Sequence, residues 1–485
     1  MSRDACRFLV VGAAAVQIAC FSNSSSSASS AAQVADATVD GEGTGALDGG
    51  APNVGTVTIS KDGGVPISSV AFGQNYWDWV DWAGTGVTGL TGTQSLVSSL
   101  HLNLIRAGGN NNDTNSPSPF DNGQIDQFVA YCRDAGAEPI LQVPLVANNV
   151  DGGAATPQNA ADIVTYANVM MGYGVRYWEI GNEPDLYATD YDASFPIQTA
   201  SDYCTAFQAY VAAMKAANAA GPDGGTPIQF LGPELSYKYI PGADWLTPFL
   251  DACKDYVDVV TIHRYPFSGT ATSQTGALTD DRSFQTTLRS VMAIVQGHAR
   301  PNTPLGVTES NISYAYALSS YTQTSLLAAP GTFYAAIWTA DDMGVALENG
   351  LWTLAFWNIG ETSPMSSVLG FIQGGQPSPS FYAEQMVSGK LSGTMLSPIG
   401  VPSGYSVYAS YDAVALSTHV LVINKTMTPG SLTLSIESLS AQSFEFPPLS
   451  ITTIQLPDVG DGAPPSVTQY SAALAAANQG PQVVQ

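Results

Sequence analysis

The feature that most constrains this chain's fold is an alternation, repeated eight times, of short apolar runs with amphipathic helical segments. Strands that are buried on both faces read as continuous apolar runs, and their alternation with helices implies a parallel sheet. Helical patterns follow seven of the runs, as at Thr199–Ala220 and Gly331–Gly350. Eight such units predict a (β/α)8 TIM barrel. The runs begin at Ser68, Leu102, Glu138, Arg176, Ile228, Val257, Pro304 and Gly350.

The pattern changes near Phe381. From there apolar and polar residues alternate with a period of two and helix signals are few, which predicts a small antiparallel β-sandwich packed on the barrel. An early stretch, residues 55–60, is a candidate strand for that sandwich. The expected domains are therefore the barrel at residues 55–380, the β-sandwich at 381–457, and a polar, flexible tail at 458–485.

Residues 1–20 have the composition of an export signal. Two arginines precede the apolar run Phe8–Ala19, which is too short to span a bilayer as a mature helix. The run ends in "QIAC", which resembles a bacterial lipoprotein signal with Cys20 as the lipid anchor, although Gln17 occupies a position where leucine is usual. A plain secretory signal cleaved near Ala32 is the alternative. In both cases we expect an exported protein, at the cell surface or outside the cell.

The segment that follows, residues 21–54, is rich in Ser, Gly and Asp and offers little to bury. It predicts a flexible spacer that carries the folded part away from the cell surface. No other segment has the ~20 apolar residues that a transmembrane helix needs.

The charge and the motifs exclude several classes of partner and cofactor. With 40 acidic and 15 basic residues among 485, the net charge of −25 argues against nucleic acid or anionic membrane surfaces as partners. Four histidines without ligand spacing predict no catalytic metal. No nucleotide, dinucleotide or esterase motif occurs, so no cofactor is expected. The body's cysteines, at 132, 204 and 253, contain no Cys-x-x-Cys pair and could form at most one disulfide; we favour the interpretation that they are small buried hydrophobes.

Active sites of such barrels lie at the C-terminal ends of the strands. There Asn182-Glu183-Pro184 ends the fourth predicted strand and Glu309 ends the seventh. Two carboxylates across a barrel mouth suit glycosidic cleavage, in which one protonates the leaving oxygen and the other attacks the anomeric carbon. A separation of about 5–5.5 Å gives retention and roughly 6.5–9.5 Å gives inversion. Glu234 and Glu361 are rivals for the second role.

The Asn-Glu-Pro of strand four, combined with a glutamate ending strand seven, resembles the pattern of clan A retaining glycoside hydrolases over residues 55–457. The resemblance implies that Glu183 is the acid/base and Glu309 the nucleophile of a double displacement. It further implies that Asn182 hydrogen-bonds the sugar 2-hydroxyl and that Pro184 fixes the turn. Three more residues would complete the site: Arg106 and Tyr265 holding the nucleophile ionised, and Trp357 forming the floor under the sugar.

A finer resemblance is to glycoside hydrolase family 79, the branch of β-glucuronidases and heparanases. It rests on "WEIGNEPDLY", on the Arg-x-Gly-Gly of strand two and on the closing β-sandwich. It implies that Tyr314 helps bind a sugar carboxylate. Arg264 and Lys238 are further candidates for pairing with a carboxylate, although surface charge explains either residue equally well. Neighbouring families that act on β-xylosides, arabinofuranosides or β-glucans share the core motifs, so a β-glucan- or xylan-type glycosidase is an alternative.

Further substrate contacts are expected from Asn75 and Trp77 near the end of strand one, and from His263 at the end of strand six. Flat aromatic faces such as Trp77 suit the apolar face of a pyranose, although core packing explains such a loop equally well. A non-catalytic surface protein that binds polysaccharide is the competing class. Both interpretations predict an oligo- or polysaccharide as the partner.

Overall fold

The computed structural model describes residues 54–76, 92–113, 121–146, 155–191, 195–240, 244–267, 273–314, 331–361, 369–458 and 464–485. The predicted export signal, nearly all of the predicted spacer, and Trp77 lie outside these ranges.

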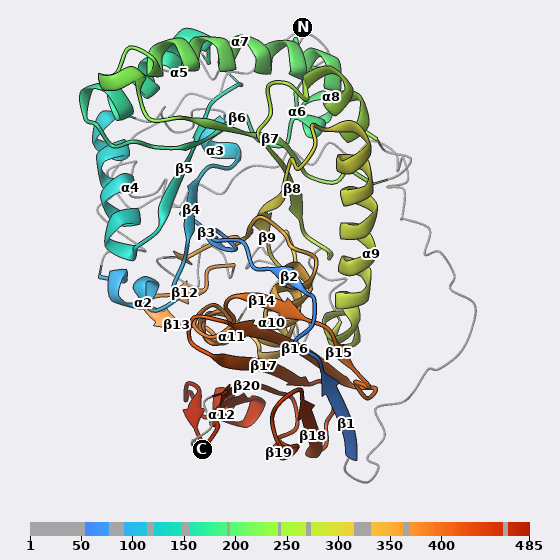
Figure 1. Ribbon diagram of the computed structural model, residues 1–485. Helices are drawn as coiled ribbons and strands as arrows, with labels where there is room; N and C mark the ends of the chain where they lie inside the picture. The colour runs from blue at the N-terminus through green and yellow to red at the C-terminus, as the bar shows by residue number, and fades with distance from the viewer. Residues whose placement is uncertain are drawn as a thin grey trace, which may run out of the picture. The chain divides into compact units, whose positions relative to one another are not determined.

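Eight parallel strands close into a barrel and follow one another in chain order, with the last strand pairing with the first (Figure 1). Each of the eight apolar runs contains one barrel strand, so the predicted fold class is confirmed. Most positions in these strands are buried, because the barrel interior and the surrounding helices cover both faces. The strands are β3 (Phe72–Asn75), β4 (Leu104–Ala107), β5 (Glu138–Val143), β6 (Tyr177–Ile180), β7 (Gln229–Leu235), β8 (Val259–Arg264), β9 (Leu305–Ser310) and β10 (Leu354–Phe356).

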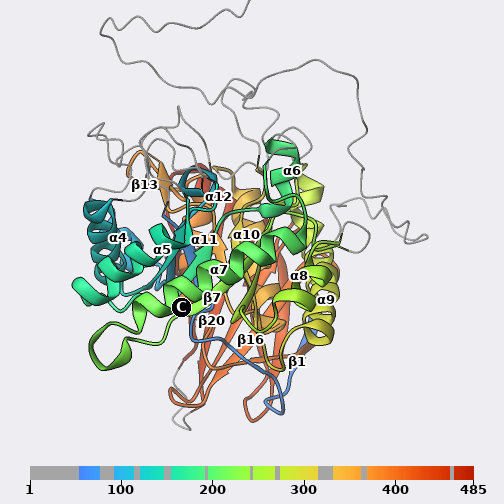
Figure 2. The ribbon, with the colours of Figure 1, turned by 90° about the horizontal axis from the view of Figure 1, so that it is seen from above.

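Helices lie along the outside of the barrel, with α4 and α9 on opposite sides in both views (Figures 1 and 2). Their starts follow from local sequence: the side chain of Asp121 caps α4 and that of Thr199 caps α7, each in a capping box. The helices are α2 (Gln94–Ser98), α3 (Asn110–Asp113), α4 (Asn122–Ala135), α5 (Pro157–Val164), α6 (Tyr187–Asp190), α7 (Ala200–Asn218), α8 (Leu246–Cys253), α9 (Gln274–His298), α10 (Phe333–Glu348) and α11 (Pro379–Ser388).

Two further sheets form the C-terminal β-sandwich, with orders β15-β1-β18-β19 and β2-β14-β16-β17-β20-β21-β22. Its own apolar core lies between them, and β18 alternates buried and half-buried positions. The early strand β1 joins the smaller sheet, where it pairs in parallel with β18. The strands are β1 (Val54–Ile59), β2 (Val65–Pro66), β14 (Thr394–Leu396), β15 (Pro398–Ile399), β16 (Tyr405–Asp412), β17 (Ser417–Asn424), β18 (Gly430–Ile436), β19 (Gln442–Phe446), β20 (Ser450–Pro457), β21 (Ser466–Ser471) and β22 (Gln482–Val483).

The structure differs from the expected boundaries at both ends of the sandwich. Residues 379–388 form α11, a helix with mostly buried residues, and the sandwich strands that follow the barrel begin only with β14. Residues 464–485, expected to form a flexible tail, contain β21, the short helix α12 (Ala472–Ala476) and β22. β21 pairs with β20 over six residues, so hydrogen bonds to a neighbouring strand order a segment whose composition alone favours a loop.

The sandwich packs on the barrel through α10, which is almost entirely buried. Gly344 of this helix lies against the ring of Tyr408, which a Cβ atom would approach to 2.4 Å. Asp341 accepts a 2.7 Å hydrogen bond from the Tyr408 hydroxyl and also contacts Lys425. The contact between the two domains is therefore both apolar and ionic.

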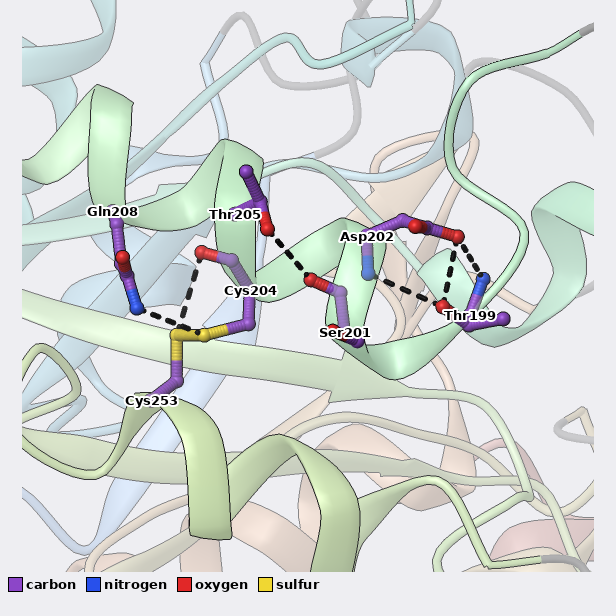
Figure 3. Close-up of a disulfide and its surroundings, with 7 residues drawn as sticks. All are labelled: Thr199, Ser201, Asp202, Cys204, Thr205, Gln208 and Cys253. Atoms are coloured by element: carbon purple, nitrogen blue, oxygen red, sulfur yellow. Dashed lines mark hydrogen bonds between the residues drawn. A yellow bond between two sulfur atoms is a disulfide. The ribbon is translucent and has the colours of Figure 1, made fainter.

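A disulfide links Cys204 of α7 to Cys253 of α8 (Figure 3). The expectation that all the body's cysteines are plain buried hydrophobes is therefore wrong for this pair, whose Cα atoms are brought to 5.7 Å by the packing of two successive barrel helices. Cys132 is a buried free thiol, as that expectation requires.

No helix within the described ranges combines the length and the apolar character that crossing a bilayer requires.

Candidate active site

Glu183 follows β6 in a turn that the local sequence makes possible. Gly181 has a φ of +76°, Glu183 itself adopts the left-handed conformation, and Pro184 begins a 3-10 turn, Pro184–Leu186. The backbone N–H of Glu183 donates to the carbonyl of Glu234 at 3.1 Å. The turn is thereby tied to the end of the next barrel strand, and Asp185 strengthens the tie by accepting hydrogen bonds from Ser236.

The carboxyl group of Glu183 faces a histidine. Its Oε1 lies 3.0 Å from Nδ1 of His263, and its side chain is 21% exposed, so solvent and substrate can reach it. Burial raises the pKa of Glu183 above its usual value, although the hydrogen bond and charge of His263 oppose the shift. A carboxyl group with a raised pKa retains its proton to higher pH, which suits a proton donor.

The carboxylate of Glu309 is held by two donors on opposite oxygens. Arg106 donates from Nη1 to Oε1 at 2.7 Å, and the hydroxyl of Tyr265 donates to Oε2 at 2.9 Å. Both partners therefore stand where the sequence analysis expected them. Together they stabilise negative charge on Glu309 and fix its orientation, as a nucleophile requires.

The two carboxyl groups approach each other across the barrel. One oxygen of Glu183, one oxygen of Glu309 and one ring nitrogen of His263 all lie within 4.8 Å of one another. The two carboxyl groups are therefore near enough to act on the same glycosidic bond.

The same three groups are close enough to surround a cation, and the ring of His263 also contacts a further carboxylate. Its Nε2 lies 2.9 Å from Glu234, while its Nδ1 faces Glu183. Burial lowers the pKa of His263, but the charge of Glu309 and the hydrogen bonds to Glu183 and Glu234 outweigh burial and raise it to about 10. Both ring nitrogens of His263 therefore face carboxylates, which hold the ring between Glu183 and Glu234.

Beneath this pair lies the fully buried guanidinium of Arg106. Its Nε donates to Glu179 at 2.5 Å, and its two terminal nitrogens donate to Glu309 and Asn182. Burial alone would lower the pKa of Arg106, but the charges of Glu179, Glu309 and Glu234 raise it further above its usual value. Arg106 therefore joins strands β4, β6 and β9 as a permanent cation. Further contacts go to Asn75 and Gln142.

Glu234, the main rival for the role of nucleophile, is fully buried, and both of its carboxylate oxygens already have partners. Its Oε2 contacts His263 at 2.9 Å and accepts from Thr308 at 2.5 Å, and Thr261 donates to its Oε1. Burial tends to raise the pKa of Glu234, but the hydrogen bond from His263 and the charge of Arg106 lower it to about 2. It is a supporting anion beneath the site rather than a group open to substrate.

The other residues predicted to bind substrate differ in how far they are open to it. Asn75 is buried, and its amide donates to two backbone carbonyls while accepting from Arg106, so no polar atom of it remains for a sugar. Trp357 is half-buried and lies over Gly109, where a Cβ would come within 2.8 Å of the ring and 3.8 Å of Glu309. Tyr314 is 63% exposed and packs edge-on against Tyr265.

The two cations proposed for a sugar carboxylate are both engaged. Arg264 is buried and pairs with Asp280 and Asp342 on the helices outside the barrel. The ammonium group of Lys238 donates to the backbone carbonyl of Asp185.

Sequence reasoning missed two buried groups near the site, Glu179 and the pair Asp113–Tyr187. Glu179 points at Arg106 from within β6, and burial raises its pKa to about 8 against the opposing charge of Arg106. An acid inside an otherwise apolar run was the available signal for Glu179. For Asp113 and Tyr187, which lie on short helices after their strands, no comparable pattern exists.

No family model matches this chain, and no curated protein sequence matches it. Solved structures do match over most of its length. A bifunctional glucanase-xylanase from a metagenome library is 17% identical, with a TM-score of 0.62, and the match covers 84% of this chain and 99% of that one. A family 51 α-L-arabinofuranosidase from Bifidobacterium longum is 14% identical, with a TM-score of 0.61 and coverage of 84% and 100%.

A third similar structure is a xyloglucanase of glycoside hydrolase family 44 from Paenibacillus polymyxa. It is 13% identical, with a TM-score of 0.60, and the match covers 83% of this chain and 99% of that one. At identities this low the likeness shows the fold. The matches extend beyond the barrel into the sandwich, because they cover 83% or 84% of this chain and the barrel alone is shorter than that.

Proposed function

We propose that this protein is a retaining glycoside hydrolase in which Glu309 is the nucleophile and Glu183 the acid/base. The observation that carries the proposal is that an oxygen of Glu183 and an oxygen of Glu309 lie within 4.8 Å of each other, with Arg106 and Tyr265 donating to Glu309 alone. These unequal surroundings suit different roles for the two groups, attack by Glu309 and proton donation by Glu183. The names of the similar structures, all of them glycosidases, support the same class.

The reaction would proceed in two displacements. Glu309 attacks C1 of the sugar, the bond from C1 to the leaving oxygen breaks, and Glu183 gives its proton to that oxygen. A water molecule then attacks C1 from the side of Glu183, which takes the water's proton as the bond between C1 and Glu309 breaks. Both enzyme residues return to their starting states.

The first test is hydrolysis of four aryl glycosides by the wild type and by Glu309→Ala. The panel contains a β-glucuronide, a β-glucoside, a β-xyloside and an α-L-arabinofuranoside. We expect the wild type to cleave at least one and the variant to lose turnover by a factor of about 10⁴ or more. Added azide should restore part of the activity of Glu309→Ala and give a glycosyl azide of inverted configuration. An azide product of retained configuration would exclude Glu309 as the nucleophile.

For the sugar itself, our first candidate is a β-glucuronide. Its support is the sequence likeness to family 79 together with Tyr314, whose exposed ring packs against Tyr265 beside the nucleophile. Strong cleavage of the β-glucoside with little cleavage of the β-glucuronide would contradict this candidate.

A neutral β-glucan or xylan is the second candidate, and one observation favours it. Arg264 and Lys238, the cations considered for a sugar carboxylate, already contact Asp280, Asp342 and the carbonyl of Asp185. The names of the neighbouring glucanase-xylanase and xyloglucanase agree with this candidate. The panel above separates the two.

We also propose that the protein is exported, with lipid attachment at Cys20 as one outcome and free secretion as the other. The support is the N-terminal signal pattern and the Cys204–Cys253 disulfide, since disulfides persist mainly in oxidising compartments. Labelling cells with a radioactive fatty acid distinguishes the outcomes, because only a lipoprotein incorporates label that a Cys20→Ser variant lacks.

A further inference from the structure

Behind Asn182 lies a short chain of buried polar groups that the proposed reaction does not use. The hydroxyl of Tyr187, in α6, donates to Oδ2 of Asp113, the last residue of α3. The same hydroxyl accepts a 3.2 Å hydrogen bond from the backbone N–H of Asn182. Oδ1 of Asp113 accepts from the backbone N–H of Leu145 at 2.7 Å. This chain therefore joins the segments that follow β4, β5 and β6.

The arrangement costs stability and restricts its neighbours, which argues that it has a role besides packing. Burial raises the pKa of Asp113 to about 6, despite its hydrogen bonds with Tyr187 and Leu145. A buried carboxyl group costs stability that an apolar side chain in its place would not. Space is also reserved for the hydroxyl, because a Cβ on Gly181 would lie 2.6 Å from the Tyr187 oxygen.

The residue held by this chain faces the reacting centre. Oδ1 of Asn182 accepts from Nη2 of Arg106 at 3.0 Å, and Nη1 of the same guanidinium contacts Glu309 at 2.7 Å. Nδ2 of Asn182 makes no hydrogen bond with any residue within the described ranges. A sugar bonded through C1 to Glu309 carries its 2-hydroxyl on the adjacent carbon. The amide of Asn182 is hydrogen-bonded to the same guanidinium group as Glu309, which puts it within reach of that hydroxyl.

We propose that Asp113 and Tyr187 are positioning residues that hold the backbone of Asn182 so that its amide donates to the substrate's 2-hydroxyl. The inference rests on the proposed glycosidase function. Hydrogen bonds to this hydroxyl strengthen in the transition state of glycoside hydrolysis, so a small displacement of Asn182 reduces the rate rather than the stability.

The experiment compares Tyr187→Phe with the wild type on two substrates: the aryl glycoside of the panel that the wild type cleaves best, and its 2-deoxy analogue. Phenylalanine keeps the ring and removes the hydroxyl. We expect kcat/KM to fall about 10- to 100-fold on the 2-hydroxy substrate and about threefold or less on the 2-deoxy substrate. In an Asn182→Ala background, Tyr187→Phe should add little, because the amide it positions is already gone.

Tyr191→Phe is the matched control, because its ring lies 5.7 Å from that of Tyr187 in the same aromatic cluster. We expect it to leave the ratio of the two substrates unchanged. Should Tyr187→Phe fail to fold, Asp113→Asn takes its place, since asparagine keeps an acceptor for Leu145 and loses the oxygen that faces Tyr187.

Equal losses on both substrates, while the wild type remains active, would overturn the positioning role and leave the glycosidase proposal intact. Failure of the wild type on the whole panel and on polysaccharides would overturn both.

Discussion

The hydroxyl of Tyr265 donates a 2.9 Å hydrogen bond to one oxygen of Glu309, opposite the oxygen that Arg106 contacts. Burial and the charge of Glu309 raise the pKa of Tyr265 well above its usual value, so the phenol stays a donor at any working pH. In the proposed reaction this carboxylate loses its charge during attack and regains it when the glycosyl-enzyme breaks down. Tyr265 would then assist the departure of Glu309 in the second displacement as well as orient it in the first.

Removing that hydroxyl in Tyr265→Phe should lower turnover about 10- to 100-fold, because a hydrogen bond to a charged group contributes roughly 1.5–3 kcal/mol. The measurement is steady-state hydrolysis of the best aryl glycoside. Tyr191→Phe is the control, since its ring packs against Tyr187 and Phe195 rather than beside Glu309. Equal effects of the two substitutions would contradict the role given to Tyr265.

Glu183→Ala should discriminate between leaving groups. We expect a loss of about 10²–10⁴ on substrates with poor leaving groups, which need protonation, and a far smaller loss in the first displacement of a dinitrophenyl glycoside. Azide should accelerate this variant and give a product of retained configuration, because azide replaces the water that Glu183 activates. Equal losses on all leaving groups would remove Glu183 from the role of acid.

The same residue should set the alkaline side of the pH profile. Since burial raises the pKa of Glu183, its proton persists above the usual titration range of a glutamate, and activity falls when that proton is lost. On a dinitrophenyl glycoside, under conditions in which the first displacement limits the rate, the fall in activity at alkaline pH should be smaller. An unchanged fall with that leaving group would assign the titration to another residue.

A pH-dependent stability effect is expected from Glu384 of α11, which is fully buried and accepts a 2.6 Å hydrogen bond from Gln74. Burial raises its pKa from 4.5 to about 8, against the opposing hydrogen bond. The folded state therefore binds this proton more tightly than the unfolded state, and stability falls as pH rises from about 4.5 towards 8. Glu384→Gln should raise the melting temperature more at pH 8.5 than at pH 5.

Thermal unfolding of both proteins at the two pH values checks this. Glu437→Gln is a suitable comparison, because that carboxylate is exposed. A gain in stability from Glu384→Gln that is the same at both pH values would show that Glu384 does not titrate differently in the two states.

Loss of the Cys204–Cys253 disulfide should destabilise the barrel. The bond closes a loop with a sequence separation of 49 residues, and such cross-links stabilise by about 2–4 kcal/mol, largely through the unfolded chain. We expect the double variant Cys204→Ala/Cys253→Ala to melt several degrees below the wild type. Cys132→Ala, which removes a buried free thiol, controls for lost packing. A double variant no less stable than this control would contradict the prediction.

Local sequence determined the barrel and the two candidate catalytic residues. Strand and helix periodicities are properties of neighbouring residues, and a parallel barrel presents the ends of its strands at one face whatever the loops contain. Asn182-Glu183 and Glu309 could therefore be assigned to that face before any contact was known. Arg106 and Tyr265 followed from the resemblance, and both contact Glu309 in the structure.

Only the tertiary structure decided which partners and which charged neighbours each of these site residues has. Arg106 and Glu309 are 203 residues apart, and the state of His263 depends on carboxylates from three other strands. The occupied amide of Asn75, the Asp113–Tyr187 chain and the pairing of Cys204 with Cys253 likewise depend on distant segments meeting. Periodicity reports which face of an element is buried, whereas charge, protonation and pairing depend on which side chains converge there. That convergence exists only once the barrel has closed.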